Sequence, residues 1–115
     1  MYYNNNYYGR ILDVIMDLES LDQGIYRVKI PFMSVTTTVY IYTCRQGTAI
    51  IDSATYPSDV DDYILPALEA LHIPHSAVTR LLLTHDHGDH AGGFARLREV
   101  FPLADATNSL EDGKI

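Results

Sequence analysis

The sequence predicts a mixed α/β (α+β) fold, in which an N-terminal antiparallel meander is followed by a β-α-β-α-β unit. The first half is rich in Val, Ile, Thr and Tyr, which favour strands, and turn residues interrupt it at short intervals. The second half alternates short apolar runs with segments whose apolar residues recur at helical spacing. A hydrophobic content of 47% in 115 residues is enough to form the core of one small domain.

Four strands joined by short connections are expected in the first half, which makes them antiparallel neighbours. The predicted strands are 11–16, 24–30, 35–44 and 48–52. A polar turn at 19–23 separates the first two, and Pro31 ends the second. Gln46 and Gly47 make a tight connection into the fourth strand.

The segment after these strands changes in pattern. Residues 48–51 are nearly all apolar, which is typical of a strand covered on both faces. The next segment carries one apolar helical face, formed by Val60, Ile64, Ala67, Leu68 and Leu71. Ser58 is the expected N-cap of this helix. Pro66 removes a backbone donor, which predicts a kink or a helix start nearer Asp62.

The rest of the chain completes a β-α-β-α-β unit. The predicted elements are a loop at 72–76, a strand at 78–84, a helix at 91–101 ended by Pro102 and a strand at 103–106. Helical crossovers make the three strands of such a unit parallel. Asp52 and His85, which follow two of these strands, should therefore lie at the same edge of the sheet. Gly92 and Gly93 allow the next helix to approach this edge closely.

Composition and charge narrow the classes of function. A formal net charge of −7 disfavours nucleic acid, whose binding needs cationic side chains, and also an anionic membrane surface. Cys44 is the only cysteine, so no Cys-rich zinc site is possible, and we expect its side chain to be a buried apolar group. Residues 1–8 are expected to form a loose tail without the features of a secretory signal, before a single domain at 9–115. These features favour a cytoplasmic protein.

Residues 84–93 are the densest group of metal-binding side chains in the sequence. His85 and His87 are two residues apart just past a strand, so both can point toward one ion. Asp89 and His90 follow a glycine and could face a second ion beside the first. Imidazole and carboxylate suit zinc, iron or manganese. The alternative is a polar turn without ligands, but histidines at i, i+2 and i+5 interleaved with Asp are rare by chance.

Three other polar residues, Asp52, His72 and His75, could belong to a metal site or have an ordinary structural place. Asp52 could cap the turn before Pro57, or it could orient a ligand imidazole from the second shell of a metal site. His72 and His75 precede the strand 78–84, and seven residues at ~3.3 Å each put them ~20 Å from its far end. We therefore interpret them as ordinary loop histidines.

The segment 84–93 matches the T-H-x-H-x-D-H-x-G-G motif of the metallo-β-lactamase superfamily, and the chain resembles this family over about residues 20–107. The resemblance implies half of an αββα sandwich and two zinc ions, with iron or manganese as alternatives. By resemblance, His85 and His87 would bind the first metal, and Asp89 and His90 the second. Asp89 would also be catalytic, because it would orient the nucleophile.

The function implied by the resemblance is metal-dependent hydrolysis. A metal-activated hydroxide would attack an ester, thioester, lactone or amide of a small molecule. One alternative is a phosphodiesterase or nuclease of the same superfamily, because the sequence His87-Gly88-Asp89-His90 resembles the motif of RNA-processing members. The net charge of −7 weighs against it. Another alternative is an inactive metal-binding or interaction module.

The sequence departs from the family pattern after the motif. The family completes its sites with two more histidines and a bridging aspartate, whereas no histidine follows His90 here. The family sandwich is also about twice as long, so we expect this chain to be an incomplete fragment that corresponds to the N-terminal half, with partial or absent metal. A half-sandwich exposes an apolar face, which predicts a homodimer or a domain-swapped oligomer.

Overall fold

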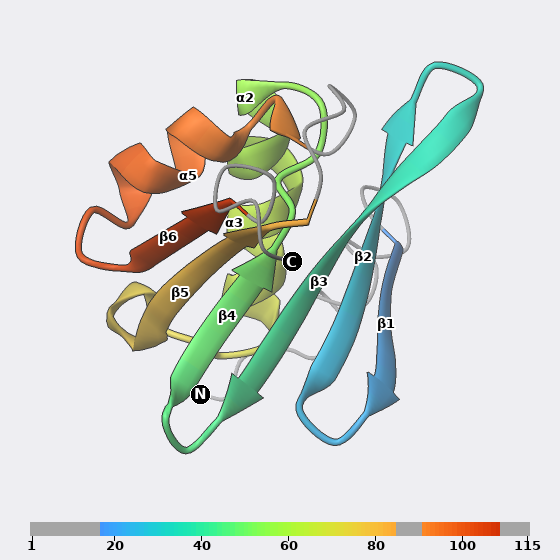
Figure 1. Ribbon diagram of the computed structural model, residues 1–115. Coiled ribbons are helices and arrows are strands. Elements are labelled where there is room, and N and C mark those ends of the chain that lie inside the picture. Colours follow the sequence, from blue (N-terminus) through green and yellow to red (C-terminus); the bar gives the residue numbers. More distant parts are fainter. Residues whose placement is uncertain (1–16, 85–90, 109–115) are drawn as a thin grey trace.

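The computed structural model describes residues 17–84 and 91–108, which form one mixed sheet (Figure 1). Its strands, in spatial order, are β1 (Asp17–Asp22), β2 (Ile25–Phe32), β3 (Val35–Cys44), β4 (Gly47–Ile51), β5 (Val78–Leu83) and β6 (Asp105–Asn108). The pairs from β1 to β4 are antiparallel, and β4, β5 and β6 are parallel. The predicted order of a meander followed by a β-α-β-α-β unit is confirmed.

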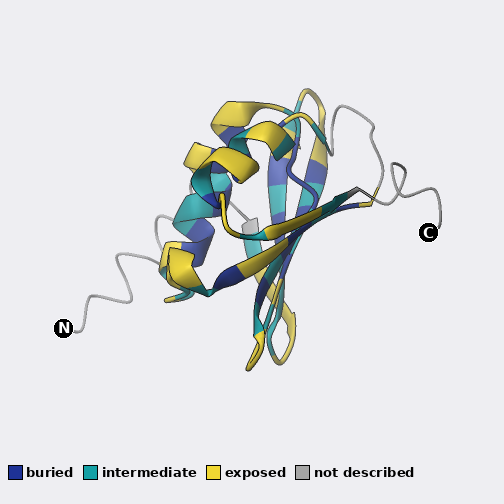
Figure 2. Cartoon of the chain, turned by 60° about the vertical axis from the view of Figure 1, so that its left-hand side comes forward, coloured by how far each residue is buried: buried dark blue, intermediate teal, exposed yellow. Residues whose placement is uncertain are grey.

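Helical segments connect the parallel strands and lie on one face of the sheet (Figure 2). The first connection contains α2 (Pro57–Asp59), the π-helical segment η1 (Val60–Ile64), α3 (Leu65–Ala70) and the short 3₁₀ segment η2 (His75–Ala77). The second contains α5 (Phe94–Val100). Consecutive β-α-β crossovers have the same hand, so both connections return over the same face. No helix among the described residues is long and apolar enough to span a membrane.

The core lies between this face of the sheet and the helices. The sheet contributes fully buried side chains from four strands: Val28, Ile30, Val39, Ile41, Ile50 and Leu81. The helical connections contribute fully buried Val60, Ile64, Ala67, Leu68 and Leu97. Four of the five residues of the predicted helical face are thus fully buried, and Leu71 packs against them partly buried. The apolar helical face predicted from the sequence is therefore the face that packs in the core.

The predicted boundaries of the first strands are wrong. β1 occupies most of the expected turn at 19–23, and the chain turns instead at Gln23 and Gly24, where Gly24 has φ 77°. Pairing with β2 makes this polar segment a strand, and Arg27 donates to Glu19 across the pair. Pro31 lies inside β2 rather than at its end, where it is in register with Thr36 of β3. The predicted strand 11–16 and the predicted tail 1–8 lie outside the described residues.

Two expectations about burial are also wrong. In β4, Thr48 and Ile50 are buried, but Ala49 and Ile51 are only half-buried, because the helices cover one face of the sheet. Cys44 is exposed rather than buried. It is the last residue of β3, at the hairpin turn, and its thiol donates to Gln46 Oε1 at 3.1 Å.

The first helical connection differs from the prediction in its start and in its interior. The helix begins at Pro57 with Tyr56 as its N-cap, so Ser58 lies inside the first turn. The predicted start nearer Asp62 is wrong, and Pro66 is instead preceded by a π-helical segment, in which the Leu65 N–H donates to the Val60 carbonyl five residues earlier. Widening the turn in this way accommodates a proline ring that would otherwise clash with the carbonyl four residues back.

The last predicted elements are displaced by a few residues. The regular helix begins at Phe94 rather than at residue 91, because Gly92 and Gly93 form a turn. It ends at Val100, before Pro102 as expected. The final strand is Asp105–Asn108 rather than 103–106, since residues 102–104 form a turn in which Leu103 is 98% exposed.

Candidate functional site

The carboxyl ends of β4 and β5 lie side by side, as the parallel arrangement predicts. The Asp52 N–H donates to the Leu82 carbonyl at 2.7 Å, which continues the β4–β5 pairing one residue beyond β4. Thr84 directly follows β5. Asp52 and the residue immediately before the histidine motif therefore meet at one edge of the sheet.

The Asp52 carboxylate holds Thr84. Its Oδ1 accepts the Thr84 N–H at 2.9 Å, and the Thr84 hydroxyl lies 2.9 Å from Oδ1 and 2.8 Å from Oδ2. Asp52 is only 5% exposed, and hydrogen bonds to an ionised carboxylate are stronger than neutral ones. Neither sequence interpretation of Asp52 described this attachment to the residue before the motif. The role of Asp52 in orienting a ligand imidazole stays a prediction.

Residues 52–56 form a loop, called here the anchoring loop, whose first three residues are buried and whose backbone conformation is unusual. Asp52 has φ 72° and Ala54 has φ 67°, a region that non-glycine residues seldom adopt. Ser53 and Ala54 are fully buried. The carboxylate of Asp59, itself 6% exposed, accepts the N–H of Thr55 at 3.2 Å and the N–H of Tyr56 at 3.0 Å through Oδ2. A side chain from the following helical segment thus fixes the far half of the loop.

Gly93 contacts the same loop through its backbone. A Cβ atom at this position would lie 2.4 Å from the Ser53 carbonyl oxygen and 3.2 Å from that of Tyr56. It would also lie 3.0 Å from Cγ2 of Val60. Only glycine permits this approach, so the expectation that a glycine brings the next helix close to this edge is confirmed for Gly93.

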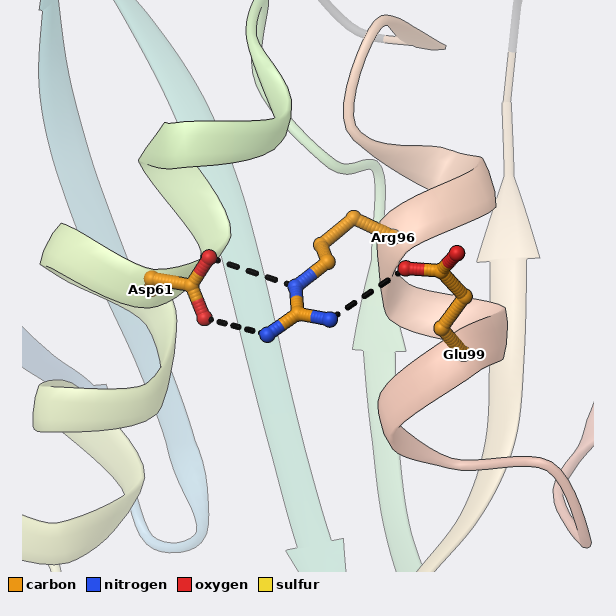
Figure 3. Close-up of polar contacts among 3 residues, drawn as sticks. All are labelled: Asp61, Arg96 and Glu99. Carbon is orange, nitrogen blue, oxygen red and sulfur yellow. Dashed lines mark hydrogen bonds and ion pairs between the residues drawn. The ribbon is translucent and has the colours of Figure 1, made fainter.

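An ion pair fastens α5 to η1 beside the anchoring loop (Figure 3). Arg96 donates through Nη2 to Oδ1 of Asp61 at 2.8 Å and through Nε to Oδ2 at 3.2 Å, and through Nη1 to Glu99 at 3.2 Å. The hydrogen bond from Arg96 lowers the pKa of the Asp61 carboxyl, and the pKa of Arg96 is raised in turn. Sequence analysis missed this contact because no local spacing links residues 35 apart.

The four predicted metal ligands, His85, His87, Asp89 and His90, lie outside the described residues, so their mutual arrangement stays a prediction. In the described part of the chain, no three His, Cys, Asp or Glu side chains form a group that could hold a metal.

The other two histidines discussed above lie near the start of β5 rather than its carboxyl end. His72 follows α3 with φ 60°, and His75 begins the segment that leads into β5. The ring of His75 contacts Phe101 edge-on at a centroid distance of 5.2 Å. Their placement agrees with the interpretation as loop histidines.

Fold, sheet-edge geometry and motif together agree with a match to known proteins. Residues 34–114 match the family model described as the metallo-β-lactamase superfamily, and the chain belongs to this superfamily. It is similar to an atrochrysone carboxyl ACP thioesterase of Passalora fulva, with 36% identity over 79% of this chain and 28% of the relative. It is also similar to the atrochrysone carboxyl ACP thioesterase AacuM of Aspergillus aculeatus, with 34% identity over 90% of this chain and 34% of the relative.

Solved metallo-β-lactamases share the fold. A motif mutant of the Cronobacter sakazakii enzyme aligns with a TM-score of 0.65 and 26% identity over 77% of this chain and 32% of that one. The class B3 di-zinc enzyme LRA-12 from an Alaskan soil metagenome aligns with a TM-score of 0.65 over 77% of this chain and 31% of that one, and at 21% identity it supports the fold alone. The chain therefore spans about a third of the length of the proteins it matches.

Proposed function

We propose that this chain contributes the H-x-H-x-D-H part of the metal site of a metal-dependent hydrolase. His85 and His87 would hold one zinc ion, and Asp89 and His90 a second. Imidazole and carboxylate groups are a donor set that suits zinc, and also iron or manganese. The observation that carries the proposal is the attachment of Thr84 to Asp52, because the donor set begins one residue after this anchored position at the carboxyl edge of the sheet.

The chemistry proposed is attack of water on a carbonyl centre. Bound zinc lowers the pKa of a coordinated water and acts as a Lewis acid. Asp89 would orient the attacking water, while Asp52 holds the start of the segment. Among ester, thioester, lactone and amide substrates, the names of the two curated relatives favour a thioester. The net charge of −7 disfavours the nuclease alternative.

Zinc binding and thioester hydrolysis can be tested separately. The purified chain is dialysed against zinc, its bound zinc is measured, and turnover is followed on an acyl thioester, the matching oxygen ester, a lactone and a β-lactam. Because the chain carries only part of the family's donor set, we expect weak zinc retention and slow turnover, with a preference for the thioester. Zinc binding without turnover of any substrate would instead support the metal-binding module, and absence of zinc binding would contradict the proposal.

Two histidine variants supply the control. His85→Ala removes a proposed ligand and should lower bound zinc. His72→Asn removes a histidine near the start of β5, and Asn tolerates the φ of 60° at that position. It should leave bound zinc unchanged. Equal zinc loss in both variants would mean that the histidines bind zinc without forming the proposed site.

We also propose that the sheet face without described helices associates with a second copy of the chain. This outer face carries Tyr40, Tyr42, Ala49, Ile51 and Leu82, which lie in register across β3, β4 and β5. Tyr42 is 44% exposed and the other four are half-buried. Apolar surface of this kind drives association. Light scattering should give the mass of a dimer and a lower mass for Tyr42→Lys, whereas a monomer at all concentrations would contradict the proposal.

A further inference from the structure

We infer that Asp59 is a positioning residue for the proposed metal site, acting through the anchoring loop 52–56. The inference rests on the proposed function and adds a residue that lies outside the histidine motif. It is carried by described residues alone: the anchoring loop, Thr84, Asp59 and Gly93.

The anchoring loop contacts both ends of the segment 84–93. At the first end, Asp52 accepts the N–H and binds the hydroxyl of Thr84. At the other end, the backbone of Gly93 lies so close to the Ser53 and Tyr56 carbonyls that no Cβ fits between them. Because the two ends of the segment rest on one loop of five residues, the conformation of that loop determines how far apart they are held.

This conformation needs support from outside the loop. Asp52 and Ala54 both have positive φ, and such residues persist only where their surroundings over-determine them. Among the described residues, the Asp59 carboxylate supplies that support by accepting two consecutive N–H groups, those of Thr55 and Tyr56. Without it, both amides would lose their acceptor at a part-buried site, which favours rearrangement of the loop.

A purely structural role for Asp59, the third and last residue of α2, would be to cap the start of this helix by accepting the Tyr56 N–H. That role predicts a loss of overall stability without a specific effect on Thr84. A positioning role predicts that removing the Asp59 carboxylate disturbs Thr84, to which Asp59 is linked through the anchoring loop. The protection of the Thr84 amide, hydrogen-bonded to Asp52, separates these two roles.

The experiment compares amide hydrogen exchange in the full 115-residue chain and three variants. Asp59→Ala removes both acceptor bonds, Asp59→Asn keeps one amide oxygen as an acceptor, and Asp61→Ala removes a neighbouring carboxylate that binds Arg96 instead of the loop. We expect Asp59→Ala to raise exchange at Thr84 at least tenfold relative to the core residue Leu81. Asp59→Asn should restore most of the protection, and Asp61→Ala should leave this ratio unchanged.

Gly93→Ala tests the same loop from its other side and serves if Asp59→Ala does not fold. The added Cβ must displace the Ser53 carbonyl, so protection of Thr84 should fall although Gly93 is nine residues away in sequence. Unchanged exchange at Thr84 in Asp59→Ala would overturn the inference. If Asp59→Ala does not fold, unchanged exchange at Thr84 in Gly93→Ala would overturn it. So would an equal effect of Asp59→Ala and Asp61→Ala.

Zinc affinity of the same variants is the second measurement. Residues that support metal ligands typically change metal affinity by about 10- to 100-fold when removed, so Asp59→Ala should weaken zinc binding at least tenfold and Asp61→Ala should not. If the unmodified chain binds no zinc, the proposed function fails, while Thr84 exchange still decides the role of Asp59.

Discussion

Replacement of Asp52 is the perturbation whose effect can be worked out most fully from the structure. Asp52→Ala removes the acceptor of the Thr84 N–H and of the Thr84 hydroxyl. A hydrogen bond to a charged group contributes about 1.5–3 kcal/mol net. Thr84 is exposed, so water can replace part of the interaction and the lower end of this range applies. Alanine at φ 72° adds backbone strain of about 1 kcal/mol. The expected loss is about 2–4 kcal/mol in the free energy of unfolding.

Asp52→Asn is the matched control for this prediction. Asparagine tolerates a positive φ, its amide oxygen can accept the Thr84 N–H, and its NH₂ group can donate to the Thr84 hydroxyl. Loss of the charge should therefore cost only about 0.5–1.5 kcal/mol. The assay is urea unfolding followed by circular dichroism, with unchanged m-values as evidence that both variants retain the native fold.

A double-mutant cycle isolates the contact itself. Thr84→Val removes the hydroxyl and keeps the N–H, so the coupling with Asp52→Ala reports the hydroxyl–carboxylate interaction and should be about 0.5–3 kcal/mol. An Asp52→Ala loss below about 0.5 kcal/mol, in the range of ordinary surface substitutions, would refute the reasoning. Equal losses for Asp52→Ala and Asp52→Asn would refute it as well.

Three further predictions concern the packing around the site. Gly93→Ala forces a Cβ to 2.4 Å from the Ser53 carbonyl oxygen and should destabilise the chain by about 1–3 kcal/mol in thermal unfolding. The hydrogen bond from Arg96 lowers the pKa of the Asp61 carboxyl. The ionised carboxylate therefore stabilises the fold above the pKa that Asp61 has in the unfolded chain, and this contribution is lost as the pH falls through the lower pKa of the folded chain. Asp61→Asn should remove this part of the loss of stability in acid, measured by unfolding experiments over a pH series. Leu68→Ala in the fully buried core should cost about 2–5 kcal/mol by urea unfolding, and a cost near zero would contradict the core described above.

The second half of the fold could be predicted because its pattern is local. The apolar run of β4 and β5 and the helical spacing of residues such as Ile64 and Leu68 carry the β-α-β order by themselves. β1 could not be located in the same way. Its sequence is mostly polar, and it forms a strand because β2 pairs with it. The exposure of Cys44 likewise depends on its position at a hairpin end rather than on residue type.

The sequence supplies the proposed chemistry of the candidate site but not its structural support. The proposed donor residues from His85 to His90 come from residue types and spacing alone, and their arrangement stays a prediction. The attachment of Asp52 to Thr84 joins residues 32 apart in sequence, and the close approach of Gly93 to Ser53 joins residues from different connections. Such contacts depend on how the parallel strands and the anchoring loop pack, which no periodicity in the sequence records.

X-ray absorption at the zinc edge of the zinc-loaded chain tests the central claim most directly, namely that the segment beginning at Thr84 binds zinc. We predict a first shell of nitrogen and oxygen at about 2.0–2.2 Å, with scattering from more than one imidazole. A sulfur neighbour at about 2.3 Å would indicate binding at the exposed Cys44 and would contradict the account. A shell of oxygen without imidazole would contradict it equally.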